Sequence, residues 1–174
     1  GSLRLPNGRL LHRYRAAEAA VPANLDDYAF FICGLIDLYE ANFEARYLQA
    51  AIMLNRDLLE HFWDETGAGG FFFSADDGEA LLLRQKELYD GALPSGNSVA
   101  LHNLLRLARM TANADFEKKA ARMGRAFASV VLQHPSAATH FLTAFDFALG
   151  PSCEVVIAGS LRQAETRQFL KKLR

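Results

Sequence analysis

The sequence predicts a mainly α-helical protein that forms part of an α/α toroid, a ring of helical hairpins. Three predicted helices carry apolar residues around most of their circumference, and two carry them on one stripe. Because a helix that is apolar on all sides is buried on all sides, the alternation along the chain predicts inner helices wrapped by outer ones. A simple four-helix bundle would instead require one-sided helices throughout. A helical-repeat solenoid is the alternative, although the sequence shows no repeat period.

The composition fits a single folded domain. The chain has 174 residues, of which 51% are hydrophobic and thirteen are Phe, so it can bury a sizeable core. Its formal net charge of −1 gives no electrostatic reason to expect a nucleic acid or an anionic membrane as a partner. No apolar run is long enough to span a bilayer, and no secretory signal is visible. Cys33 and Cys153 show no metal-ligand spacing. We therefore expect a cytoplasmic protein with no metal and no cofactor.

The first part of the chain predicts a short strand and two helices. The strand is expected at residues 10–14, after a turn around Gly8. Asn24 is suited to cap the helix at residues 25–41, with Asp27 at its third position. The helix at residues 44–64 has one apolar stripe and one charged face, so we expect it to be half exposed.

A β-hairpin and three further helices are expected next. Glycines precede residues 71–73 and turn formers follow them, which predicts pairing with residues 81–83. The loop at residues 90–97 opens into an apolar helix that Ser95 or Asn97 can cap. The three helices are predicted at residues 98–110, 114–133 and 136–149.

The end of the chain differs from the preceding run of apolar helices. Residues 153–158 predict a strand, and a polar helix follows them. We therefore divide the chain into a partial toroid domain, residues 1–150, and a strand–helix extension, residues 151–174. One strand cannot satisfy its own backbone. Its partner would be the strand near Leu11, another chain, or a segment outside this sequence.

Four stretches of the sequence resemble a known family: LDDYAFFICGLIDLYEANF (25–43), GGFFFS (69–74), DGALPSGNSVALHNLLRLA (90–108) and EVVIAG (154–159). They are similar to the C-terminal part of the thioredoxin-domain-containing family that includes the spermatogenesis-associated thioredoxin-like proteins of animals. The resemblance implies a thioredoxin-like domain followed by an α/α toroid similar to six-hairpin glycosidases and N-acylglucosamine 2-epimerases. The thioredoxin part and its cysteine motif are absent from this sequence, so no redox role carries over. A complete toroid needs more helices than are predicted here, so we expect part of one.

Candidate site residues lie where the predicted inner helices begin. Asp26, Asp27 and Asp90 could supply a catalytic carboxylate pair for sugar chemistry, or they could simply cap helices and turns. Ser95 and Ser98 could donate hydroxyl groups to a ligand, but capping is the favoured interpretation. His102 and His140 fall on predicted inner helices. The resemblance implies a fold similar to epimerases that use histidine for proton transfer. The two histidines could equally be core residues. The remaining candidate ligand contacts are Tyr28, Phe72, Glu87 and Asn97.

Two functions compete on this basis. One is a carbohydrate-binding or carbohydrate-modifying toroid whose ligand is a sugar or sugar phosphate. The other is an interaction module that docks a thioredoxin-like domain or a second copy of itself. Because a partial toroid should expose apolar inner-helix surface, we expect a homo-oligomer. A cleft enzyme predicts carboxylates converging on an open pocket, whereas a docking module predicts aspartates held in capping bonds and aromatic rings packed shut.

Overall fold

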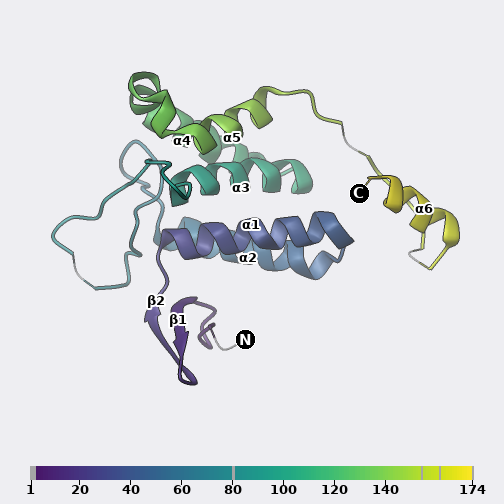
Figure 1. The fold of residues 1–174 in the computed structure, drawn as a ribbon, viewed down its shortest axis with the longest axis horizontal. Coiled ribbons are helices and arrows are strands. Elements are labelled where there is room, and N and C mark those ends of the chain that lie inside the picture. The colour runs from purple at the N-terminus through teal and green to yellow at the C-terminus, as the bar shows by residue number, and fades with distance from the viewer. Residues whose placement is uncertain (1–2, 80, 154, 161, 174) are drawn as a thin grey trace.

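The structure, a computed structural model, describes residues 3–79, 81–153, 155–160 and 162–173. These residues form a mainly helical protein with one small sheet (Figure 1). The elements are β1 (Leu11–Arg15), β2 (Glu18–Pro22), α1 (Leu25–Asn42), α2 (Ala45–His61), α3 (Gly96–Thr111), α4 (Ala114–Gln133), the short 3-10 helix η1 (Pro135–Ala137), α5 (Thr139–Leu149) and α6 (Ala164–Leu173). The predicted helices are therefore confirmed, with ends shifted by a few residues.

Helix α3 lies at the centre of the helical array. It packs against α1 on one side and α5 on the other, and α4 also contacts it, while α2 packs against α1. Three of its leucines, Leu101, Leu104 and Leu107, are fully buried. A side-chain bond reinforces the packing, because Nδ2 of Asn103 donates to the carbonyl of Ala29 in α1 at 2.8 Å.

Local capping explains where α1 and α3 begin. The side chain of Asn24 accepts from the N–H groups of Asp26 and Asp27, and Asp27 accepts from the N–H of Asn24 in return, so the predicted capping box is confirmed. Ser95 caps α3 by accepting from the N–H of Ser98 at 3.2 Å. Each bond satisfies an N–H group that the helix itself cannot pair.

Burial on all sides is confirmed for α3 and is wrong for α1 and α5. Phe31 of α1 is 52% exposed and Leu149 of α5 is 86% exposed. The physical reason is the position of each helix in the array. Among the described elements α3 has helical neighbours on both flanks, whereas α1 and α5 each have a flank that no described helix covers.

The predicted hairpin between residues 71–73 and 81–83 is wrong. Phe71 instead forms an isolated bridge with Trp63, and the N–H of Phe73 donates to the carbonyl of Gln85. Gly69 and Gly70 have φ angles of +99° and +83°, a conformation that glycine adopts without strain. They turn the chain back, so that the carbonyl of Gly70 accepts from the N–H of Asp64 and Phe71 reaches Trp63. Leu82 is exposed.

The sheet is an antiparallel hairpin at the N-terminal end. The predicted strand at residues 10–14 is confirmed as β1, and it pairs with β2, which the sequence did not predict. Two alanines, Ala16 and Ala17, form the turn with φ angles of +50° and +64°. Turns of this kind normally use asparagine and glycine, which explains why the sequence carried no hairpin signal.

The predicted strand at residues 153–158 is also wrong for the residues described there, 153 and 155–158, which belong to no strand. Residue 154 lies outside the described residues. The polar helix expected after this segment is present as α6, and it lies away from the helical array at the end of an extended linker (Figure 1).

Candidate functional site

The N-terminal ends of α1 and α3 meet around Asp26 and Gly96. The N–H of Gly96 donates a hydrogen bond to the half-buried Asp26. A Cβ on residue 96 would overlap Oδ1 of Asp26 and lie 2.7 Å from Cγ of Leu25. Glycine is therefore required at this position by the close approach of α1 and not by its backbone angles.

Asp26 is an uncompensated carboxylate. Burial raises its pKa above the ordinary value of 3.8, the N–H of Gly96 opposes this shift, and the nearby charges of Glu87 and Asp27 raise the pKa further. Within the described chain, neither Asp26 nor Glu87 forms an ion pair, whereas Asp27 is paired with His12 at 2.9 Å. Asp26 and Glu87 are thus two acidic groups close enough to interact, without a basic partner. Such pairs are typical of functional sites.

Asp27 and Asp90, the other two predicted catalytic residues, are engaged in structural bonds. Asp27 completes the capping box and contacts His12. The buried Asp90 accepts from the N–H groups of Ser95 at 2.8 Å, His140 at 2.8 Å and Phe141 at 3.3 Å. The Asp90 side chain therefore caps α5, because the N-cap residue Ala138 has no side chain that can accept a hydrogen bond. These bonds also connect α5 to the loop before α3.

The polar residues of the loop before α3 are also saturated. Asn97 is fully buried, accepts from the N–H of Phe71 at 2.8 Å, and donates to the carbonyls of Phe71 and Glu87. The hydroxyl of Ser95 donates to that of Ser98 at 3.0 Å. Asn97 therefore holds the segment around Phe71 against α3, and all three side chains are buried.

The predicted aromatic contacts differ in accessibility. Tyr28 is fully buried against Phe62, and its hydroxyl accepts from the N–H of Leu10 at 3.0 Å. Phe72 is half buried, with Arg84 and Lys86 lying over its ring at 4.3 Å and 5.0 Å. Beside them is a hollow of about 290 Å³ whose lining includes the predicted residue Glu87. The lining residues are Phe73, Ser74, Leu81, Leu83, Gln85 and Glu87.

A second polar group lies between α1 and α3, and the sequence interpretation missed it. The guanidinium of Arg106 is largely buried and donates to Asp37 at 2.6 Å and to Glu40 at 2.8 Å. Burial alone would lower the pKa of Arg106, but the two carboxylates raise it. The sequence does show an arginine that interrupts an otherwise apolar helix, which indicates a polar contact. The partners of this arginine could not be identified from spacing along the chain.

The same region holds the predicted residue His102. Burial, together with the charges of Arg106 and His140, lowers its pKa to about 4, so this imidazole is neutral at pH 7. Its ring lies next to the rings of His140 and Phe147. The structure therefore brings together the two inner-helix histidines that the sequence singled out.

A further cluster joins the end of α2 to the loop after Phe73. His61, Asp76 and Asp77 have potential metal-ligating atoms within 4.8 Å of one another. His61 bonds to Asp76 at 3.0 Å, and Arg9 pairs with Asp77 at 3.0 Å. The sequence did not indicate this group, since His61 is distant from the two aspartates along the chain. Arg9 therefore links the N-terminal segment to this cluster.

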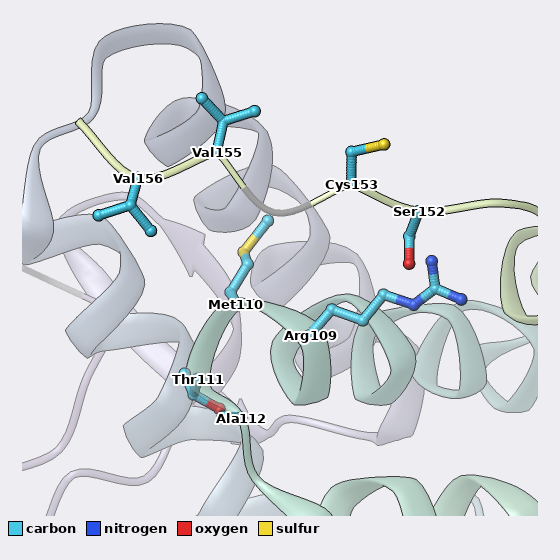
Figure 2. Close-up of a pocket in the computed structure, with 8 residues that line it drawn as sticks. All are labelled: Arg109, Met110, Thr111, Ala112, Ser152, Cys153, Val155 and Val156. Atoms are coloured by element: carbon cyan, nitrogen blue, oxygen red, sulfur yellow. The ribbon is translucent and has the colours of Figure 1, made fainter.

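A groove lies at the C-terminal end of α3. Its volume is about 580 Å³. Arg109 and Met110 extend from α3 toward the segment that carries Ser152, Cys153 and Val155 (Figure 2). Cys153 is a free, exposed thiol. None of the described residues that line this groove carries a carboxylate or an imidazole.

Comparison with known proteins identifies relatives that match 84% and 55% of the chain. No family model matches the chain. Among the described residues, none of the helices combines the length and the apolar character needed to cross a bilayer. The chain is 37% identical over 95 residues, 55% of its length, to an uncharacterised protein of Caenorhabditis elegans.

The mammalian relatives match a longer stretch. The chain is 37% identical over 147 residues to spermatogenesis-associated protein 20 of Homo sapiens, and equally to that of Rattus norvegicus. The match covers 84% of this chain and 19% of each relative, so the chain spans about a fifth of the length of these proteins. It is therefore homologous to one part of spermatogenesis-associated protein 20.

Proposed function

We propose that this chain is an interaction module: it forms part of an α/α toroid and docks further helices through the open flanks of its helical array. The observation that carries this proposal is the apolar surface left exposed on either side of α3. On α1 this surface includes Phe31 and Leu38, and on α5 it includes Leu142 and Leu149. Exposed apolar surface of this kind marks interfaces.

The order of the helices supports the toroid. Helices α1, α3 and α5 are neighbours in that order, and α2 and α4 each pack against the preceding member of this row. This is the arrangement expected of consecutive hairpins in a two-layered ring. The capping bonds of Asp27 and Asp90 and the buried ring of Tyr28 also match the expectations for a docking module.

For the chain alone, we propose that the partner is a second copy. In the longer relatives the same flanks would contact additional helices or the thioredoxin-like domain that the family resemblance implies. Both flanks belong to rigid helices, so docking would not require the chain to refold.

Sedimentation at micromolar concentration tests self-association. The unmodified chain is expected to be at least a dimer, and Phe31→Glu or Leu149→Glu should shift it toward the monomer. Leu82→Glu is a matched control, because Leu82 is fully exposed in a loop away from both flanks. A monomeric unmodified chain, or equal dissociation by the control, would refute the proposal.

A second candidate function is carbohydrate binding or modification at the mouth formed by Asp26 and Glu87. The specific observation in its favour is the raised pKa of Asp26, caused by burial and by the neighbouring charge of Glu87. A carboxyl group that keeps its proton can act as a general acid while a second carboxylate acts as base or nucleophile. The adjacent hollow has one aromatic wall, Phe73, against which a sugar ring could stack.

Thermal unfolding against a panel of sugars and sugar phosphates tests this second function. A ligand at about 100 times its dissociation constant adds roughly 2.7 kcal/mol of stability. The shift should disappear in Asp26→Asn and Glu87→Gln and persist in Asp115→Asn, which alters an exposed carboxylate of α4. A shift of equal size in all four proteins would place the ligand elsewhere.

A further inference from the structure

His102 of α3 and His140 of α5 lie side by side where these two helices pack together. Their ring centroids are 5.4 Å apart, and the ring planes are inclined by 58°. His102 also contacts Phe147, at a centroid distance of 5.3 Å. The pair is therefore positioned by two helices, which hold side chains more precisely than loops do.

The two imidazole rings are not satisfied by the protein. The Nε2 atom of His140 is buried and has no hydrogen-bond partner among the described residues. Within the same part of the chain, the ring of His102 forms no hydrogen bond and no ion pair, only the two ring contacts. Leaving a buried polar atom unpaired destabilises the folded state, so the unpaired nitrogen requires an explanation.

Charged side chains of both signs lie near the pair. Arg106 lies one turn after His102 on α3, and it is paired with Asp37 and Glu40 of α1. Arg109 lies over the ring of Phe147 at 4.6 Å and donates to the carbonyl of Ala148. Both arginines are therefore held by partners other than the two imidazole rings.

We propose that His102 and His140 together bind one divalent transition-metal ion, such as Zn²⁺, Ni²⁺ or Cu²⁺. With metal–nitrogen bonds of about 2.0–2.1 Å, two imidazoles on one ion have ring centroids about 5 Å apart, close to the observed separation. Imidazole nitrogen suits these metals, whereas Mg²⁺ and Ca²⁺ prefer oxygen ligands.

Both proposed ligands are imidazoles held by helices that pack against each other, α3 and α5. The protein supplies two ligands, which leaves other coordination positions for water or for a ligand that carries oxygen or nitrogen. The site does not require that the chain bind a sugar or associate with a second copy.

Calorimetric titration with Ni²⁺ and Zn²⁺ at neutral pH tests the proposal. The unmodified chain is expected to bind one ion with micromolar affinity through this pair, and His102→Gln and His140→Gln should each weaken that binding at least tenfold. Two controls separate this pair from other histidines: His61→Gln removes the histidine beside Asp76 and Asp77, and His134→Gln removes a histidine at the end of α4. Unchanged binding in the two test variants, or loss of binding in His61→Gln instead, would overturn the assignment.

A spectroscopic measurement keeps the test decisive if His140→Gln disturbs the fold. In the unmodified protein, electron paramagnetic resonance of bound Cu²⁺ should show coupling to two imidazole nitrogens, and in His102→Gln it should show coupling to one. Coupling to a single nitrogen in the unmodified protein would contradict a shared ion.

Discussion

Asp90 and Asp26 lie near the starts of α5 and α1, the two helices on either side of α3, yet their surroundings are opposite. Asp90 is buried and accepts three backbone N–H bonds. Asp26 is half buried, accepts from Gly96, and faces Glu87 without a basic partner. Two carboxylates near helix N-termini therefore differ in how completely backbone donors saturate them.

The largest expected effect is that of Asp90→Ala. Removing this carboxylate leaves the first N–H groups of α5 and the N–H of Ser95 unpaired, which should lower the free energy of unfolding by about 3 kcal/mol. Chemical denaturation followed by the fluorescence of Trp63, which is buried, measures the change. Asp90→Asn keeps an acceptor oxygen and should lose less. A loss below about 0.5 kcal/mol for the alanine variant would show that Asp90 is not a fastener.

Gly96→Ala tests the close approach of α1 and α3 around Asp26. The added methyl group overlaps Asp26 and Leu25, and such overpacking should destabilise the protein by about 2 kcal/mol. Gly34→Ala is the matched control, because a Cβ there meets no atom within 4 Å. The control should gain roughly 0.5–1 kcal/mol from better helix propensity. Equal effects of the two substitutions would mean that α1 and α3 can separate at no cost.

Asp27→Ala should have an intermediate effect. It removes one half of the capping box at the start of α1 and the contact with His12, for an expected loss of about 1 kcal/mol. Asp115→Ala is the control, since Asp115 is an exposed acidic residue in the first turn of α4. If both variants lose the same stability, the capping box contributes nothing beyond the helix dipole.

Asp26→Asn should change stability least, and its effect should depend on pH. Because the pKa of Asp26 is raised in the folded state, its contribution to stability is present below the ordinary pKa of 3.8 and is lost as the pH rises through the folded value. In acid, the free energy of unfolding of the variant should therefore equal that of the unmodified chain. Above the folded pKa of Asp26, the variant should be the more stable of the two. Denaturation from about pH 3 to about pH 7 measures the difference. A difference that stays constant with pH would show that Asp26 is not perturbed.

Features that depend on neighbouring residues could be predicted from the sequence. The capping box of α1 joins Asn24 to a residue three positions later, and Ser95 caps α3 in the same way. Turn formers and apolar periodicity placed the helices for the same reason. The β1–β2 hairpin escaped prediction because Ala16 and Ala17 adopt a conformation that alanine rarely signals.

The candidate site was predicted only in part. The sequence indicated that Asp26, Asp27 and Asp90 lie at helix starts. It could not tell which of them backbone donors saturate, because two of the three partners of Asp90 lie 50 and 51 positions away. Glu87 was selected for its place in the chain, and its charge interaction with Asp26 depends on how the loop folds back. The ion pairs of Arg106 also depend on the tertiary fold, because their carboxylates belong to a different helix.

The amino-acid order alone determined the mainly helical class, the helix starts and the apolar segments, because these follow from dihedral preferences and hydrogen bonds within a few residues. Long-range packing determined that α3 is enclosed while α1 and α5 keep an exposed flank, that Phe71 bonds to Asn97 instead of to residues 81–83, and that Asp26 is left without a basic partner. Burial and charge pairing are properties of neighbours in space, and a periodic apolar pattern shows that a surface can be buried without showing what covers it.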